Sequence, residues 1–290
     1  TSMPYGNHDV FGVELNGKIY TPGGGAIHGL PAVSHNFDCL LIYDTENDRW
    51  EISPPMSINR RYCNVGLLDG KIWVIGGFNN IGNIPGKGWN DSPVNTVEIY
   101  DPVSRKWSAA PALDGPRAET VTCTMAGRLY VFGCRCDSVV NTLSIGPGEK
   151  QWRTEPAAPY PIFQNNGCVL NNQAYIMIGG VGLIMYDPAT QTWHKDFPAV
   201  PGLKAPFSPA MATYNGKIWV ISGRGTDDET QVLIYSPVDK SWSCGPSFPY
   251  PVSWVGGIEV NGNLYVFGGG SKSRISRTYK YLDRIWVLKQ

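Results

Sequence analysis

The 290-residue sequence predicts an all-β protein, a six-bladed β-propeller of four-stranded antiparallel blades. The first observation behind this prediction is a unit that occurs six times: a tight-turn pair, an aromatic residue shortly after it, and then a glycine-containing pair. The six aromatic residues are 53, 57, 45, 44 and 46 positions apart. The second observation is a Tyr/Trp-type pair, seven positions apart, that recurs in phase with this unit. The third is that no segment keeps a helical period of apolar residues.

Each unit is expected to form four short strands, which we call a to d in chain order. Strand a is small and apolar, as in Asn64 to Leu68, and an Asn-Gly or Asp-Gly pair then supplies the positive φ of a two-residue hairpin turn. Strand b carries the aromatic residue and ends at glycines, because a side chain there would obstruct the crowded centre. The strand-b aromatic residues are Tyr20, Trp73, Tyr130, Tyr175, Trp219 and Tyr265.

Strand c ends near a Tyr, and strand d starts near a Trp. The pairs are Tyr43 and Trp50, Tyr100 and Trp107, Ile145 and Trp152, Tyr186 and Trp193, Tyr235 and Trp242, and Tyr279 and Trp286. From the last pair we expect the final repeat to contain its own fourth strand, with Met3 to Asn7 as a candidate for an additional edge. The whole chain, 1–290, is then one domain, with blades at about 8–55, 60–112, 117–157, 163–200, 207–248 and 253–290.

These motifs resemble the kelch repeat over essentially the whole chain. The resemblance rests on Gly-Gly pairs such as Gly76-Gly77, on the Tyr/Trp spacing and on a period of about 48 residues. The sequence departs from the pattern at Gly133-Cys134, Ile178-Gly179, Ser222-Gly223 and Ile145. The resemblance implies a six-bladed propeller that recognises a protein, often as the substrate receptor of a ubiquitin ligase. Some bacterial kelch proteins are instead sialic-acid mutarotases.

Composition and charge exclude several classes of protein. Aromatic residues make up 12% of the chain, which excludes a disordered protein. The 24 Lys and Arg balance the 24 Asp and Glu, so we expect no binding to nucleic acid or to an anionic membrane. No segment is apolar enough to insert into a membrane, and no signal peptide is visible. A cytoplasmic location is favoured, and a secreted or periplasmic one stays open because a signal peptide could have been removed. The seven cysteines lack disulfide-scaffold spacing and are expected to be free thiols.

Strand directions place the a–b and c–d turns on one face, and the b–c loops and d-to-a crossings on the other. The second face carries the variable loops, such as 25–38 and 78–95, and we place the function there. Counting back 11 to 13 positions from each strand-b aromatic residue gives the entry to strand a. The candidate binding residues, which have the composition of recognition surfaces, are Arg60, Arg61, Tyr62, Arg117, Glu119, Phe163, Gln164, Phe207 and Trp254 from these entries, and Trp89 from the second long loop.

Each candidate also has a purely structural interpretation. Phe163 and Phe207 would hold neighbouring blades together, and Trp89 would fold its loop onto the rim. Arg60 and Arg61 would pair with acidic residues such as Asp9 or Glu119 across blades.

Glu119 is the one weak candidate for a catalytic residue, in proton transfer at the anomeric carbon of a sugar. A carboxylate flanked by arginines also suits recognition of an acidic sugar or peptide. No cofactor is expected. No metal is expected either, because His28, His35, Asp38 and Cys39 fit no recurrent ligand spacing. The copper ligands of the galactose oxidase relatives in the wider kelch group have no clear counterpart in this sequence.

The leading hypothesis is a binding module that recognises a protein or peptide, with an acidic one as the special case, through the b–c loop and central-channel face. Such a module would belong to a larger adaptor. The alternative is a sugar-active enzyme of the kelch type, such as an acidic-sugar mutarotase or epimerase. A cytoskeletal or structural scaffold is the second alternative. Enzymatic activity therefore stays open, with binding without catalysis favoured.

Overall fold

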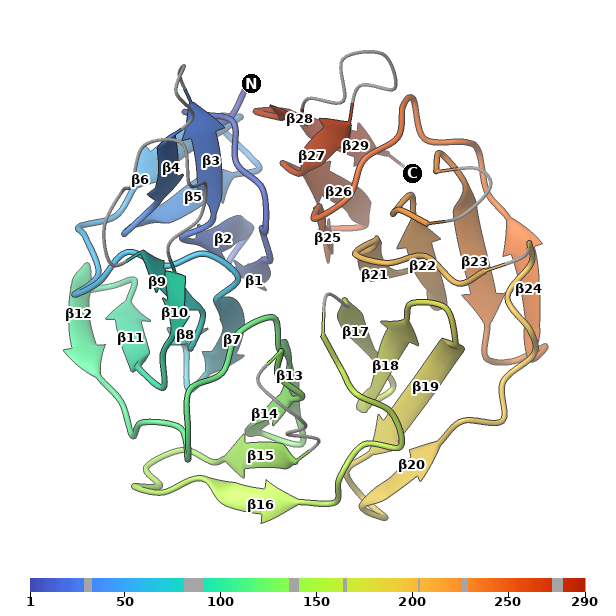
Figure 1. Ribbon diagram of the computed structural model, residues 1–290, viewed down its shortest axis with the longest axis horizontal. Coiled ribbons are helices and arrows are strands. Elements are labelled where there is room, and N and C mark those ends of the chain that lie inside the picture. Colours follow the sequence, from blue (N-terminus) through green and yellow to red (C-terminus); the bar gives the residue numbers. More distant parts are fainter. Residues whose placement is uncertain are drawn as a thin grey trace.

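A computed structural model of the chain describes residues 1–28, 33–80, 91–135, 141–163, 166–202, 204–225, 229–272 and 279–289. Six antiparallel sheets, the blades, are arranged in a ring (Figure 1). The described ranges contain no helix, which confirms the predicted all-β propeller. It follows that no helix in these ranges could cross a membrane.

The first three blades each have four strands in the order expected from the repeats. Blade 1 consists of β1 (Val13–Leu15), β2 (Lys18–Pro22), β5 (Leu40–Asp44) and β6 (Arg49–Ile52). Blade 2 consists of β7 (Asn64–Leu68), β8 (Lys71–Ile75), β11 (Val97–Asp101) and β12 (Lys106–Ala109). Blade 3 consists of β13 (Val121–Met125), β14 (Arg128–Phe132), β15 (Thr142–Ile145) and β16 (Arg153–Glu155).

Blades 4 and 5 repeat this arrangement, and blade 6 differs from it. Blade 4 consists of β17 (Gly167–Leu170), β18 (Gln173–Ile178), β19 (Gly182–Asp187) and β20 (Thr192–His194). Blade 5 consists of β21 (Ala210–Tyr214), β22 (Lys217–Ile221), β23 (Val232–Ser236) and β24 (Ser241–Cys244). In the described residues, blade 6 has only β25 (Gly256–Val260), β26 (Asn263–Phe267) and β29 (Ile285–Leu288).

The end of the chain therefore has a different role from the one expected. The segment around Trp286 pairs directly with β26, with Trp286 opposite Val266, so it is the third strand of blade 6 and not the fourth. Tyr279 belongs to a separate ribbon, and the spacing of seven between Tyr279 and Trp286 is not the strand c–d pair of the other blades.

Three of the b–c loops carry two-stranded ribbons on the loop face. The ribbons are β3 (Gly25–His28) with β4 (Val33–Asn36), β9 (Phe78–Asn80) with β10 (Asp91–Pro93), and β27 (Gly270–Lys272) with β28 (Tyr279–Tyr281). They belong to blades 1, 2 and 6, which are neighbours in the ring (Figure 1). Asn36 connects the first two, since its Nδ2 donates to the carbonyl oxygen of Phe78 at 2.9 Å.

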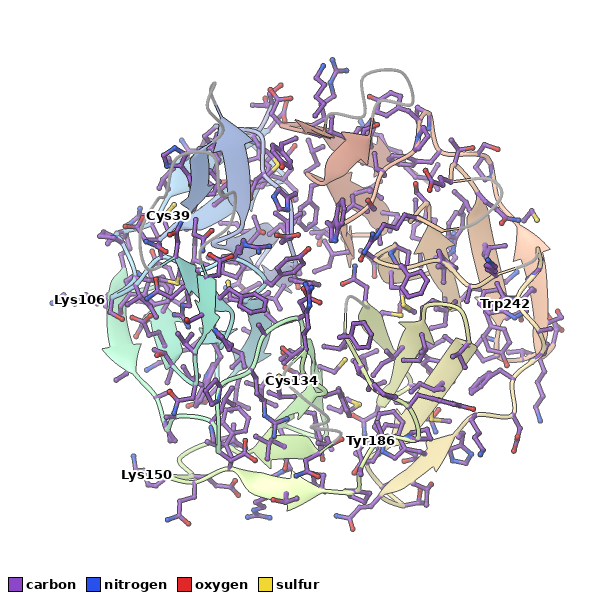
Figure 2. All side chains as sticks on the ribbon, in the orientation of Figure 1. Cys39, Lys106, Cys134, Lys150, Tyr186 and Trp242 are labelled. Carbon is purple, nitrogen blue, oxygen red and sulfur yellow. The ribbon has the colours of Figure 1, made fainter. Side chains whose placement is uncertain are left out.

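The hydrophobic core is divided into six layers, one between each pair of neighbouring blades. The layer between blades 3 and 4 contains Phe132 and Tyr186, for example, and the layer between blades 6 and 1 contains Phe267 and Tyr43. Figure 2 shows the labelled Lys106 and Lys150 pointing outward from the rim of the ring. Each sheet thus buries both faces against its neighbours, as a closed ring requires.

The glycine pairs at the ends of the strands b are where neighbouring blades approach most closely. A Cβ atom on Gly76 would lie 2.1 Å from the carbonyl oxygen of Arg117, at the entry to the next blade. The amide of Gly77 donates a hydrogen bond to that same oxygen at 2.7 Å. Gly269 donates in the same way to the carbonyl oxygen of Asn7, which connects blade 6 to blade 1. Met3 and Asn7 also donate to the carbonyls of Asp283 and Leu282, so the start of the chain contacts blade 6 without forming a named strand.

Candidate functional site

Three consecutive positions before each strand a have three different roles. The side chain 13 positions before the strand-b aromatic residue turns into its own blade. Arg60 donates through Nη1 to the carbonyls of Gly76 (3.2 Å) and Thr96 (3.0 Å), and its Nη2 forms a short ion pair with Glu98. Arg117 and Asn7 make equivalent bonds to the first glycine of their own blades, at 3.5 Å to Gly133 and at 2.9 Å to Gly23.

The position 12 before the aromatic residue is fixed by its backbone. Isolated antiparallel bridges join His8 to Gly25, Arg61 to Phe78, Phe207 to Arg224 and Ser253 to Gly270. In blade 3 the amide of Arg135 donates to the carbonyl of Ala118 at 3.0 Å. Each bridge ties the entry to strand a to the start of the b–c loop of the same blade. The next residue must therefore redirect the chain into strand a.

That next residue, 11 before the aromatic residue, has a left-handed backbone in every blade where it is described. The residues and their φ angles are Asp9 (62°), Tyr62 (51°), Glu119 (56°), Ser208 (51°) and Trp254 (57°). All five line one hollow on the channel axis, together with Phe11 and Asn166. We call these five residues the central mouth. A left-handed conformation costs a non-glycine residue about 1–2 kcal/mol, and such strain is concentrated at functional sites.

Neighbouring members of the central mouth are also connected through the backbone. The amide of Glu119 donates to the carbonyl of Tyr62 at 3.2 Å, and that of Trp254 donates to the carbonyl of Ser208 at 3.0 Å. The free space between the side chains is only about 10 Å³, enough for about one water molecule. A larger ligand would therefore rest on the central mouth rather than enter it.

Comparisons with known proteins agree with this geometry. The kelch motif model matches residues 59–113. Kelch-like protein 25 of Xenopus tropicalis is 29% identical over 249 residues, 80% of this chain and 40% of its own length. Kelch-like protein 23 of Mus musculus is 24% identical over 259 residues, 85% of this chain and 43% of its own length. These matches and the six-bladed ring support a kelch-repeat propeller family.

The kelch propeller thus spans about two fifths of the length of these curated relatives. A solved structure of YjhT matches its fold, with a TM-score of 0.79 over 100% of this chain and 96% of that one. Its sequence identity of 14% means that the likeness concerns the fold alone.

Arg61 holds one half of the central mouth together. Its Nη1 lies 3.4 Å from Oδ2 of Asp9, and its Nε donates to Oδ2 of Asp91 at 2.6 Å. The guanidinium also lies 4.8 Å from the centre of the Tyr62 ring, within cation–π range. Asp9 is buried and lies 2.7 Å from Nδ1 of His8. The expected pairing of Arg61 with Asp9 across blades is therefore present, whereas the corresponding pairing of Arg60 is not.

Glu119 is the acidic residue of the other half of the central mouth. Its carboxylate is buried and accepts from Nη1 of Arg135 at 2.7 Å, while its Oε2 has no hydrogen-bond partner among the described residues. Burial raises the pKa of Glu119 despite the opposing charge of Arg135. Burial likewise raises the pKa of Tyr62 well above its ordinary value, with the nearby charge of Asp9 acting in the same direction. The central mouth is thus a strained and poorly hydrated site with two buried acidic side chains.

The other aromatic candidates differ in their surroundings. Trp254 is half-buried, and the guanidinium of Arg224 lies 4.8 Å from its ring centre. Phe207 packs over Gly179 of blade 4, which agrees with the blade-joining role considered for it, and it lines a cavity of about 380 Å³ with Arg224 and Pro251. Phe163 is 40% exposed.

The structure therefore brings some of the sequence-predicted residues together and separates others. Tyr62, Glu119 and Trp254 are three of the five residues of the central mouth, and Arg61 reaches it. Arg60 and Arg117 do not line it; their side chains are fully buried within blades, so the expectation that they converge there is wrong. Trp89 and Gln164 lie outside the described residues.

Four further residues of the site were not among those predicted from the sequence. Asp9 and Ser208 occupy the same repeat position as Tyr62, and that position alone was enough to find them. Arg135 and Arg224 follow the glycine-containing pairs of blades 3 and 5, where the backbone bridges place them beside the central mouth. Nothing in the sequence marks these two arginines as partners of Glu119 and Trp254.

All but one of the described cysteines are free thiols. Cys39, Cys63, Cys123, Cys168 and Cys244 are free thiols as expected, whereas Cys134 is disulfide-bonded. Among the residues that the structure describes, no three His, Cys, Asp or Glu side chains are arranged to hold a metal ion.

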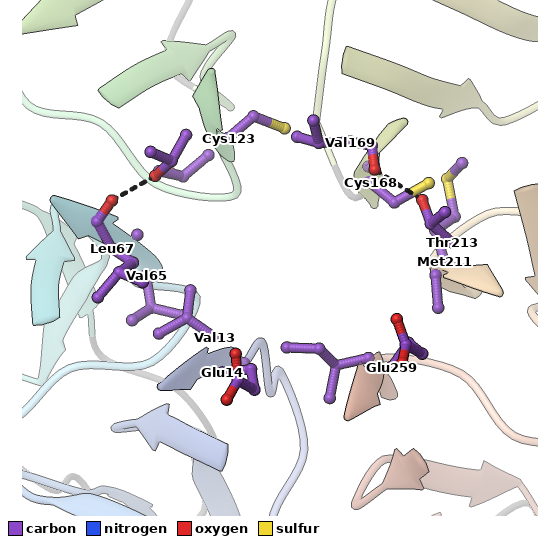
Figure 3. A pocket seen from close by; sticks show the side chains of 18 residues that line it. Val13, Glu14, Val65, Leu67, Cys123, Cys168, Val169, Met211, Thr213 and Glu259 are labelled. Carbon is purple, nitrogen blue, oxygen red and sulfur yellow. Dashed lines mark hydrogen bonds between the residues drawn. The ribbon is translucent and has the colours of Figure 1, made fainter. Parts of the chain in front are cut away.

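The opposite end of the channel is wider and chemically simpler. There the strands a enclose a cavity of about 330 Å³ (Figure 3). Glu14 and Glu259 point into it, but their carboxylates accept hydrogen bonds from the turn amides of Gly17 (2.8 Å) and Gly262 (2.7 Å). Thr124 donates to the carbonyl of Leu67 at 2.6 Å. The two glutamates stabilise hairpin turns and Thr124 connects neighbouring blades, so these polar groups have structural partners and the loop face is the better candidate for recognition.

Proposed function

We propose that this kelch propeller binds a protein segment across its loop face, with the central mouth beneath the centre of the contact. The observation that carries the proposal is the convergence of strained, buried residues at one repeat position on that face. Aromatic and arginine side chains, which dominate the energetics of protein interfaces, surround this point. Protein recognition is also what the family resemblance implies.

The ribbons define the direction in which a partner would lie. Blades 1, 2 and 6 raise ribbons above the loop face, whereas blade 4 joins β18 to β19 through the short turn Gly179–Val181. An extended segment would therefore enter over blade 4 and end against the ribbons. Trp254 and Phe207 lie along this path as flat aromatic contacts.

An acidic side chain is the group that this rim would favour. Arg135 is 51% exposed, and its one ion pair among the described residues, with Glu119, uses Nη1 and leaves other guanidinium donors for a ligand carboxylate. The same carboxylate would be repelled deeper in the site by Asp9 and Glu119, which are buried beneath. The acidic group would therefore bind at the rim and not in the hollow.

A randomised peptide library displayed on phage, selected against the immobilised protein, tests this proposal. We expect the selected peptides to contain Asp or Glu, and to lose about tenfold or more in affinity on Arg135→Ala and on Trp254→Ala. Lys217→Ala is the matched control, because Lys217 is exposed on the turn face and the change removes the same charge. Equal affinity for Arg135→Ala, Trp254→Ala and Lys217→Ala would contradict the proposed site.

The enzymatic alternative rests on Glu119, whose pKa is raised by burial and whose Oε2 has no partner among the described residues. Such a carboxyl group can exchange a proton with a ligand lying on the central mouth. The reaction to test is the interconversion of the anomers of sialic acid, followed by NMR exchange. An acceleration by the wild type that Glu119→Gln abolishes would favour the enzyme, and no acceleration would leave binding as the function.

A further inference from the structure

The residue 12 positions before each strand-b aromatic residue lies where two neighbouring blades meet on the loop face. In blade 1 this residue is His8, whose ring stacks on Tyr281 in the ribbon of blade 6, with the ring centres 4.4 Å apart. In blade 2 it is Arg61, which reaches across to blade 1. In blade 5 it is Phe207, which packs against Gly179 of blade 4. A flat side chain therefore contacts the preceding blade at three places in the ring.

Blade 6 has a serine at this position. The backbone of Ser253 is bridged to Gly270, as that of His8 is bridged to Gly25, so the chain follows the same path in the two blades. The side chain of Ser253 is 6% exposed and is much shorter than an imidazole or a phenyl side chain. A cavity of about 380 Å³ lies between blades 5 and 6, with Ser253 in its lining. The cavity thus lies where three other blades place a flat side chain of their own.

The lining of this cavity suits an aromatic ring that is attached to a peptide backbone. Phe207 and Pro251 contribute apolar surfaces. Gly225 also lines the cavity, and a Cβ atom there would approach the Phe207 ring to 3.2 Å, so glycine keeps this space open. Arg224 and Glu229 are half-buried, and their side chains can donate to a peptide carbonyl and accept from a peptide amide. The volume lies in the range of roughly 300–1,000 Å³ that is usual for ligand pockets.

We infer that this cavity is a binding site for an aromatic side chain, and that the partner segment supplies this side chain; the second part rests on the proposed function. The ring would lie against Phe207, in the place that the repeat position of Ser253 leaves unfilled. The cavity adjoins the central mouth, because the guanidinium of Arg224 lies 4.8 Å from the centre of the Trp254 ring. A segment across the central mouth would then bind through an aromatic residue at blades 5 and 6 and an acidic residue at Arg135 of blade 3.

Titration with N-acetyl-L-tyrosinamide, followed by the amide chemical shifts of the protein in NMR spectra, tests the cavity without any partner. We expect saturable binding with a Kd of about 10 mM or lower, and none with N-acetyl-L-alaninamide, which has no ring to bury. Intermolecular NOEs from the tyrosine ring to Phe207 and Val252 should locate the probe in the wild-type protein. No saturable binding, or binding without these NOEs, would overturn the inference.

A variant that fills the cavity provides a second measurement. Ser253→Phe introduces at this repeat position the side chain that blade 5 has in Phe207. We expect it to abolish the saturable binding of N-acetyl-L-tyrosinamide. Ser253→Ala is the matched control, because it changes the same residue and leaves the cavity open, and we expect it to bind the probe as the wild type does. Equal binding of the probe by Ser253→Phe and Ser253→Ala would place the probe elsewhere and overturn the inference.

The peptides selected on phage separate this inference from the proposed function. We expect them to contain an aromatic residue, and to lose about tenfold or more in affinity on Ser253→Phe but not on Ser253→Ala. Peptides that lose affinity on Arg135→Ala and bind Ser253→Phe as tightly as the wild type would overturn the aromatic site and leave the proposed function standing. Binding of N-acetyl-L-tyrosinamide in the cavity, without selection of any peptide, would support the aromatic site and contradict the proposed function.

Discussion

At the scale of single residues, the consecutive arginines Arg60 and Arg61 point in different directions and have different partners. Arg60 is fully buried and is neutralised by Glu98 within its own blade, whereas Arg61 reaches across to Asp9. A buried arginine with two carbonyl partners and a carboxylate is a structural group, since removing it would leave a buried charge without its partner. The repeat position that decides this is visible in the sequence. The directions of the two side chains are not visible, because they are set by partners far along the chain, Glu98 for Arg60 and Asp9 for Arg61.

Glu119 gives a prediction at the same scale. Because burial raises its pKa in the folded state, its contribution to stability is fully present below the unfolded-state pKa of about 4.3 and is lost as the pH rises through the folded value. Glu119→Gln removes the buried charge at almost the same volume. We expect it to raise Tm at pH 7, and this gain to disappear as the pH approaches about 4. Thermal unfolding across this range measures it, with the exposed Glu46→Gln as the control. A lower Tm for Glu119→Gln at pH 7 would show that its pairing with Arg135 outweighs its burial.

At the scale of the elements, the end of strand b is where the fold tolerates least change. Gly76 and Gly70 both have positive φ, 52° and 67°, so an alanine at either position pays the backbone cost of about 1–2 kcal/mol. Only at Gly76 would the new Cβ also meet a backbone atom, the carbonyl oxygen of Arg117 at 2.1 Å; at Gly70 nothing lies within 4 Å. We expect Gly70→Ala to lower the free energy of unfolding by about 1 kcal/mol, and Gly76→Ala by at least about 2 kcal/mol more. Urea unfolding of the two variants measures the difference. Similar losses of unfolding free energy for the two variants would mean that the backbone at Arg117 moves away from the new Cβ at little cost.

The elements also show where prediction from sequence succeeds and fails. Turn chemistry and strand-b aromatics are local signals, and they predicted all six a–b hairpins. The fourth strand expected near Trp286 is wrong because a chance spacing of seven from Tyr279 imitates the pair of the other blades. The ribbons in the b–c loops could not be predicted, since loops of variable sequence carry no repeat with which to compare them. For the site, the shared repeat position predicted Tyr62, Glu119 and Trp254. Arg135 could not be predicted, because its role rests on a contact with Glu119 that no repeat pattern marks.

At the scale of the whole molecule, stability depends on closing the ring, because each blade buries its two faces only against its neighbours. The layer between blades 6 and 1 contains residues from both ends of the chain, among them Val10 and Phe267. Backbone hydrogen bonds from Gly269 to Asn7 and from Met3 to Asp283 reinforce it. The first residues of the chain are therefore part of the closed structure, unlike the frayed ends of most domains.

Truncation of the buried Met3 side chain tests whether the start of the chain contributes to ring closure. It is 3% exposed and Met56, its counterpart in the next blade, is 5% exposed. Truncating a buried Met costs about 2–5 kcal/mol, so Met3→Ala should lower the free energy of unfolding by at least about 2 kcal/mol, as Met56→Ala should. Met56 also accepts a hydrogen bond from Arg60 at 3.4 Å, which makes it the costlier of the two by up to about 1 kcal/mol. Urea unfolding of both variants provides the comparison. A Met3→Ala variant as stable as the wild type would show that the start of the chain is frayed and that the ring closes through the inner layer alone.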